Sequence, residues 1–169
     1  MELKDAIHGR RSVRAFSAEP VPDSALHELL AAAMQAPSAG NEQPWQFVAI
    51  DDRGILDEIP EISPYAPMCR VAPLAVLVCG DMREVRHAGY WVQDCSAATE
   101  NLLLTAHALG LGAVWTGVHP NPAREAGFRR LLFLPDEVVP MALVAIGVPA
   151  ERPLPAPRFN AARVHRNGW

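Results

Sequence analysis

Cysteine is scarce in this sequence, and the few cysteines present form no recognisable pattern. The 169 residues include only three, Cys69, Cys79 and Cys95, an odd number with no Cys-x-x-Cys pair among them. No histidines stand at the spacing that would complete a zinc site with them. The sequence therefore argues against a disulfide-stabilised scaffold and against structural zinc.

An excess of positive charge and a long hydrophobic run are also missing. Fifteen Lys and Arg face 19 Asp and Glu, for a net charge of −4, which is not the balance of a nucleic-acid-binding surface. The uncharged stretch 101–123 is interrupted by glycine, histidine and proline, so it does not read as a membrane span. The first residues lack the charged-then-apolar pattern of a signal peptide. We expect a cytoplasmic protein without a nucleic-acid or membrane partner.

What the sequence does have is enough apolar residues for a substantial core. Half of the residues are hydrophobic, which at this length fits a single domain over residues 1–169. Apolar periodicity predicts helices at about 2–9, 22–35, 87–109 and 122–132, and strands at 45–50, 74–79, 113–118 and 138–148. Residues 60–73 read as a loop with a short helix, 149–157 as a proline-rich extended arm, and 160–169 as a tail that closes with a short helix. The arm is expected to cross the surface or a neighbouring subunit.

The predicted helix at 87–109 has an unusual second half. Its residues 95–109 are nearly free of charge around the whole circumference. Such a helix has to be buried on most sides. In so small a domain, a second copy of the chain is the simplest way to cover it.

A compact basic cluster stands at residues 10–14, where Arg10, Arg11 and Arg14 surround Ser12. Arginine presents a rigid fork of donors that matches phosphate oxygens, so the cluster is suited to a bound phosphate. The alternative is a solvated charged face after the first helix. The neighbouring Val13 and Phe16 favour a pocket, because they would anchor the segment against a core.

A second candidate segment follows one helix later, at residues 37–45. Pro37, Ser38, Asn41 and Gln43 precede Trp45 in a loop rich in turn-forming residues. It can be an ordinary helix-to-strand connection. Its amide side chains, however, offer both donors and acceptors to the edge of a heteroaromatic ring. Together with the basic cluster, the loop suggests a flavin mononucleotide (FMN) pocket.

The other motifs in the sequence are weaker evidence of function. Gly110-Leu111-Gly112 follows a helix and opens a strand, with Trp115 where a third glycine would be needed, so the dinucleotide-binding fingerprint fails. The glycines are instead expected to end the helix. The six histidines show neither metal-ligand spacing nor a catalytic triad order.

Taken in order along the chain, these segments resemble the nitroreductase family of FMN oxidoreductases. The resemblance is carried by 10–14, 36–45, Ala72-Pro73 before a strand ending Gly80-Asp81, 101–112, Trp115-Thr116-Gly117, 146–149, Arg158, Val164-His165 and Trp169. It is collinear over nearly the whole chain. No single motif is decisive, but their order and spacing together are specific.

The resemblance implies an α+β fold with a central mixed, mainly antiparallel sheet flanked by helices, assembled as a homodimer with FMN at the subunit interface. By family likeness, Arg10, Arg11, Ser12 and Arg158 hold the phosphate, and Arg14 approaches the ribityl chain or pyrimidine edge. Pro37, Ser38, Asn41 and Gln43 border the ring from the other subunit. Trp115, Thr116 and Gly117 pass along it, with a backbone N–H near flavin N5.

Two departures from the family pattern stand out. Many relatives carry a lysine two positions before the arginine that Arg158 matches, and this chain has Ala156 there, so phosphate binding would depend more on Arg158. The chain is also short for the family and lacks the helical excursions that cap the pocket in longer members.

The activity implied is transfer of a hydride from NADH or NADPH to the flavin and of electrons onward to a nitroaromatic, a quinone or a similar small acceptor. The flavin carries the chemistry, so no catalytic side chain and no metal are expected. Two alternatives stay open. One is a flavin-binding carrier or redox sensor without turnover, and the other is an enzyme that uses the same pocket for dehydrogenation or for reductive removal of a substituent.

Overall fold

A four-stranded sheet forms the centre of the computed structural model, which describes residues 1–169. The strands are β1 (Trp45–Ile50), β2 (Leu74–Asp81), β3 (Gly112–Gly117) and β4 (Val138–Gly147), in the spatial order β1-β2-β4-β3. All three pairings are antiparallel, and the only parallel contact is an isolated bridge between Ser12 and Ala113. The predicted α+β fold with a mainly antiparallel sheet is confirmed.

The core lies on both faces of this sheet because its central strands alternate apolar side chains between two layers. In β2 every residue is buried; Leu74, Val76 and Val78 face one layer, while Leu77 and Cys79 face the other. Such a continuously apolar strand is typical of a sheet covered on both sides. The two faces therefore need a helix layer each.

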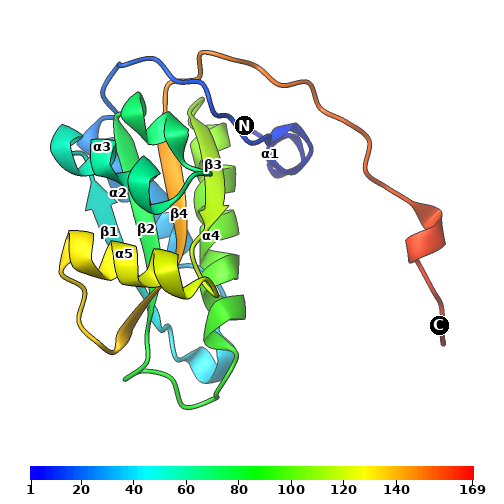
Figure 1. The fold of residues 1–169 in the computed structure, drawn as a ribbon. Coiled ribbons are helices and arrows are strands. Elements are labelled where there is room, and N and C mark those ends of the chain that lie inside the picture. The colour runs from blue at the N-terminus through cyan, green and yellow to red at the C-terminus, as the bar shows by residue number, and fades with distance from the viewer.

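Helices α2 (Asp23–Ala33) and α4 (Trp91–Ala108) cover one face, and α3 (Arg53–Ile62) and α5 (Pro122–Leu132) cover the other (Figure 1). On the first face, Leu29 and Leu102 belong to one buried cluster with residues of β2 and β4. On the second, Leu56 and Phe128 belong to another such cluster, and all four side chains are fully buried or nearly so. A short helix, α1 (Leu3–Gly9), docks on the outside of α4.

All eight predicted helices and strands are present, with boundaries that differ by a few residues. The largest difference is at α4, which begins at Trp91 rather than at His87, because the residues before it form a turn. Helix α4 is also less covered than the sequence suggested. Its buried side chains form one face, and the other face, including Ala97 and Leu104, stays partly exposed in the single chain.

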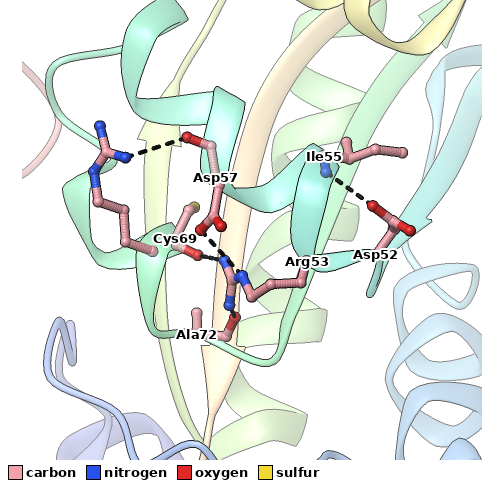
Figure 2. A network of polar contacts seen from close by, with 7 residues as sticks. Asp52, Arg53, Ile55, Asp57, Cys69 and Ala72 are labelled. Atoms are coloured by element: carbon pink, nitrogen blue, oxygen red, sulfur yellow. Dashed lines mark hydrogen bonds and ion pairs between the residues drawn. The ribbon is translucent and has the colours of Figure 1, made fainter.

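Helix α3 is an element that the sequence analysis did not predict, because Pro60 lies inside it. The helix begins where the Asp52 side chain accepts a hydrogen bond from the Ile55 N–H at 3.0 Å. Arg53 then donates to the carbonyl oxygens of Cys69 and Ala72, and its Nε lies 3.1 Å from Asp57 (Figure 2). This network fastens α3 to the short 3-10 turn at Pro67–Arg70, labelled η2.

The C-terminal arm, which runs over residues 150–169, contacts the domain through Glu151 and through the backbone of Leu154 and Ala156, and then extends away from it. After β4 the chain runs past α1 and continues outward, ending in a short 3-10 turn at Ala161–Arg163, labelled η3 (Figure 1). Every residue from 150 to 169 is exposed, including Leu154, Phe159 and Trp169. The prediction of an extended arm is confirmed. None of the helices is both long and apolar enough to cross a bilayer.

Candidate functional site

Strand β3 is one of the two edge strands of the sheet, so one side of its backbone has no partner strand. Val118 and His119 donate to the Met141 carbonyl of β4, so alternate residues Ala113, Trp115 and Gly117 direct their backbone groups away from β4. The side chains follow the same alternation: Thr116 is buried and donates to the Leu143 carbonyl at 3.2 Å. Edge backbone of this kind is free to bind a ligand.

The first end of this edge is covered by the arginine segment. The Val13 N–H donates to the Ala113 carbonyl at 3.0 Å, and Ser12 forms a bridge with Ala113. Gly112 makes the contact possible, because a Cβ there would lie 2.7 Å from Val13 Cγ1. Val13 and Phe16 are buried, as the sequence predicted. The segment therefore holds Ser12 and its arginine neighbours beside β3.

The arginines border a pocket of about 420 Å³ between α1, the end of α4 and the start of the arm. Arg10 Nε lies 3.2 Å from a carboxylate oxygen of Glu100 on α4. Arg11 donates to the carbonyls of Leu154 at 3.3 Å and Ala156 at 3.4 Å. Arg10 and Arg11 thus line the same pocket, but in this arrangement they also bind protein carbonyl and carboxylate groups.

A carboxylate already occupies the backbone donors of this segment. Glu151 Oε1 accepts from the N–H of Arg14 at 2.6 Å and from that of Ala15 at 3.1 Å. Glu151 thus shows that the donors of the arginine segment can bind an anionic oxygen, while the Arg14 side chain itself stays exposed and has no polar partner. Both observations fit the phosphate of a mononucleotide.

The loop at residues 37–43 has an unusual backbone conformation. Gly40, Asn41 and Gln43 have φ values of 57°, 56° and 51°, in the left-handed region that non-glycine residues seldom adopt. Ser38 Oγ accepts from the Gln43 N–H at 3.0 Å, and Gln43 Nε2 donates to Asn41 Oδ1 at 3.1 Å. Strained backbone of this kind persists where the surroundings fix it, and it concentrates at ligand sites.

Two acidic side chains fix that loop. Asp94, near the start of α4 and almost completely buried, accepts from the Ala39 N–H at 3.0 Å. Glu42 accepts from the backbone N–H of His87 at 3.0 Å and from the imidazole of the same residue. Although burial raises the pKa of Glu42, its hydrogen bonds from His87 and from the backbone of Arg86 hold it below its usual value. Asn41 and Gln43 are therefore exposed on a braced loop.

The arginine segment and this loop contact different stretches of α4. The loop contacts Asp94, whereas the arginine pocket includes Leu103 and His107. Arg10 also contacts α4, at Glu100; at a rise of about 1.5 Å per residue, Asp94 lies about 9 Å along the helix from Glu100 and about 20 Å from His107. The dark blue and cyan segments are at opposite ends of the molecule (Figure 1). Within one chain, the two predicted halves of the site are not brought together.

Arg158 is not brought to the arginine segment either. It is exposed and makes no hydrogen bond or ion pair, and it belongs to the part of the arm that continues away from the domain. The predicted site residues thus form three groups in the single chain. Arg10, Arg11, Ser12 and Arg14 lie at the Ala113 end of β3, and Trp115, Thr116 and Gly117 continue the same strand toward its other end. Pro37, Ser38, Asn41 and Gln43 form a second group, and Arg158 stands alone.

Sequence reasoning missed Glu151, Asp94 and Arg124, all of which contact the predicted segments. Asp94 had a recognisable signal, since a carboxylate inside an otherwise apolar helix is seldom buried without a purpose. Glu151 and Arg124 had no such signal, because each hydrogen-bonds to a residue that is distant or unremarkable in sequence.

Burial raises the pKa of the three cysteine thiols to about 12, so none is a nucleophile.

Comparison with known proteins gives a consistent picture. The profile described as "Nitroreductase family" matches residues 7–66 and 63–148. A protein of Methanothermobacter thermautotrophicus, named for NADH dehydrogenase or NAD(P)H nitroreductase activity, is 44% identical over 169 residues, covering 100% of this chain and 88% of its own. An NADH dehydrogenase of Thermus thermophilus is 31% identical, with 97% and 95% covered.

Solved structures agree with the sequence matches. A crystal structure from Parabacteroides distasonis, named for the same two activities as the Methanothermobacter protein, has a TM-score of 0.95 and 39% identity, covering 99% of this chain and 98% of its own. A nitroreductase structure from Desulfovibrio desulfuricans, in complex with FMN, has a TM-score of 0.88 and 31% identity, with 100% and 98% covered.

Proposed function

Because this chain belongs to the nitroreductase family, we propose that it is an FMN-dependent oxidoreductase, which takes a hydride from NADH or NADPH and passes electrons to a nitroaromatic, a quinone or a similar small acceptor. The single observation that carries the proposal is the open edge of β3, with the arginine segment docked at its first end. In that arrangement, hydrogen-bond donors for an anion lie at one end of the edge. Free backbone N–H groups and open space for a flat ring follow along the same strand.

The dimensions of this edge suit the cofactor. At about 3.3 Å per residue, the edge from Ala113 to Gly117 is about 13 Å long. A Cβ placed on Gly117 would meet nothing within 4 Å, so the backbone there is open to close approach. A phosphate beside Ser12 and a ring beside Gly117 then lie along the same strand.

Each group of residues has a role in this proposal. Bound FMN supplies a ring that takes up a hydride and gives up electrons. Arg10, Arg11 and Ser12 hold its phosphate by charge-assisted hydrogen bonds. The exposed Arg14 guanidinium favours negative charge at the pyrimidine edge, which stabilises the reduced form. The free N–H groups of Trp115 and Gly117 orient the ring by hydrogen bonding at its edge.

The remaining predicted residues come from a second copy of the chain. Within one chain, no hydrogen bond or ion pair joins Asn41 or Gln43 to the arginine segment, which contacts α4 from Glu100 onward while the loop contacts Asp94. In a dimer, the loop at 37–43 and Arg158 of one protomer border the ring and phosphate held by the other. The arm, with Leu154 and Phe159 about 87% and 86% exposed, would bury these side chains on its partner.

An absorption spectrum of the purified protein, followed by anaerobic titration with NADH and NADPH, tests the activity. We expect a bound flavin spectrum that bleaches with nicotinamide and returns when menadione or a nitroaromatic is added. A flavin that binds but is not bleached by nicotinamide would contradict the proposed enzyme activity and indicate a carrier.

The role of Arg14 is tested by substitution. Arg14→Ala is expected to lower the flavin affinity or the reduction potential of the bound flavin, and unchanged values would remove Arg14 from the site.

Sedimentation of the flavin-loaded protein tests the assembly. We expect a dimer whose flavin content is about one per chain. A monomer that keeps its flavin would contradict a pocket built from two subunits.

A further inference from the structure

Arg124 stands at the far end of the same β3 edge, opposite the arginine segment. It lies in the first turn of α5, which begins where the Asn121 side chain accepts from the Arg124 N–H at 3.0 Å. Its Nη1 donates to the Gly117 carbonyl at 3.1 Å. Its guanidinium is therefore held at the residue where the proposed ring would lie.

The guanidinium is also held from a second side. It lies over the ring of Tyr65, 4.8 Å from the ring centroid, and Tyr65 is 65% exposed. Stacking of this kind orients a planar cation without using its N–H donors. The Arg124 guanidinium is therefore oriented by both the Gly117 carbonyl and the Tyr65 ring, and the Tyr65 side of this stack is exposed to solvent.

No carboxylate neutralises this cation. Arg124 forms no ion pair, and the adjacent Glu125 is taken by His119, whose Nδ1 lies 2.8 Å from Glu125 Oε1. Only one of the five guanidinium N–H groups is used in a hydrogen bond. By contrast, Arg10, Arg53, Arg70 and Arg83 all pair with acidic side chains.

We propose that Arg124, oriented by Tyr65, binds an anionic group of the molecule that occupies the site and so selects anionic substrates. This inference rests on the proposed function, because it places Arg124 beside the ring. The group recognised is a carboxylate or a phosphate, which arginine binds through paired donors. It can belong to the electron acceptor or to the nicotinamide donor, and the two half-reactions separate these sources.

The acceptor is tested with a pair of nitroaromatics that differ only in charge, 4-nitrobenzoate and 4-nitrobenzamide. For Arg124→Gln we expect kcat/KM for 4-nitrobenzoate to fall about tenfold while that for 4-nitrobenzamide changes little, as loss of a charge-assisted hydrogen bond gives. Arg124→Lys keeps the charge and should restore part of the preference. Tyr65→Leu should weaken it, because the cation loses its platform.

The donor is tested by the rate of flavin reduction with NADPH and with NADH. If the phosphate of the donor is the group bound, Arg124→Gln raises the apparent Kd for nicotinamide about tenfold and leaves the ratio of the two nitroaromatics unchanged. Arg130→Gln is the matched control for both arms. It makes the same charge change on the same helix, and Arg130 is exposed without a polar partner.

A change in the nitroaromatic ratio or in the apparent Kd for nicotinamide that Arg130→Gln does not reproduce supports the proposal and identifies the source. If both the nitroaromatic ratio and the apparent Kd for nicotinamide are unchanged in a folded, flavin-loaded Arg124→Gln that still turns over, the proposal is overturned, and Arg124 is left as a clamp between α5 and β3. That result leaves the proposed function intact. A wild-type protein whose flavin NADH and NADPH cannot reduce contradicts the proposed function itself, and the inference falls with it.

Discussion

Strand β2 and the C-terminal arm contain similar apolar residues but use them in opposite ways. In β2 all eight residues are buried between two helix layers. In the arm, residues 150–169 are exposed throughout, and Trp169 and Leu154 have no apolar partner in the body of the domain. The sheet and its helices bury their apolar side chains within one chain, whereas the apolar side chains of the arm stay exposed there, although its first residues contact Arg11 and Arg14.

The same division separates the two halves of the candidate site. The arginine segment and the β3 edge are fixed by backbone contacts within the domain. Arg158 depends on the arm, and the loop at 37–43 contacts a different stretch of α4. Folding of one chain therefore positions each half separately, and in the proposed dimer it is association that would bring the halves together.

The largest effect is expected in the core, from the same substitution at two phenylalanines close in sequence. Phe128 is fully buried against β4, and Phe133 is 90% exposed. Phe128→Ala should lower the free energy of unfolding by about 3–5 kcal/mol through a cavity, while Phe133→Ala should change it by less than about 0.5 kcal/mol. Chemical denaturation measures both. Equal effects would contradict the placement of the core.

The arm should show the reverse behaviour, affecting assembly rather than folding. Leu154→Asp with Phe159→Asp removes two side chains whose burial contributes about 1.5–3 kcal/mol each. We expect a folded chain with a native circular dichroism spectrum that dissociates at micromolar concentration and loses flavin. Phe133→Asp is the control at an exposed phenylalanine outside the arm. If the double variant stays dimeric, the arm does not contribute to the interface.

The arginine segment should separate phosphate binding from ring binding. Arg11→Ala is expected to weaken FMN binding about ten- to a hundredfold, the effect of one charge-assisted hydrogen bond. The affinity for riboflavin, which lacks the phosphate, should change little in the same variant. Fluorescence titration of the apoprotein with both flavins checks this. An equal loss for the two ligands would place Arg11 at the ring instead.

The smallest effect is expected at the loop, from acid. The lowered pKa of Glu42 means that its stabilisation is present above the ordinary glutamate pKa and is lost as the pH falls through the lower folded-state value. Flavin affinity should therefore weaken below about pH 4.5 as Glu42 is protonated and releases His87. Glu42→Gln should bind flavin more weakly at neutral pH and show less of this pH dependence. Identical pH profiles would show that the loop does not depend on Glu42.

The strands and most helices could be predicted because each has a local signal, such as the continuous apolar run of β2 or the Leu26-Leu29-Leu30 face of α2. Helix α3 was missed because Pro60 suggested a break. Its signal was the Asp52 cap followed by Ile55, Leu56, Ile59 and Ile62 on one face.

The site was only partly accessible to sequence reasoning. The anion-binding character of residues 10–14 follows from the side chains themselves. The open edge of β3 does not, because it depends on the strand order, and neither does Arg124, whose partners Gly117 and Tyr65 are identified only by the fold. The lack of contact between the two predicted halves in one chain is likewise a property of the fold.

The central claim, a flavin site shared between two chains, is tested most directly by subunit complementation. Arg11→Ala and Asn41→Ala chains carry different tags, and the mixed dimer is purified through both. A shared site places both defects in one pocket and leaves the other intact, so the mixed dimer should bind one FMN per two chains with wild-type affinity. Weakened binding at both sites would contradict the account, because it would place residues 11 and 41 in the same pocket of the same chain.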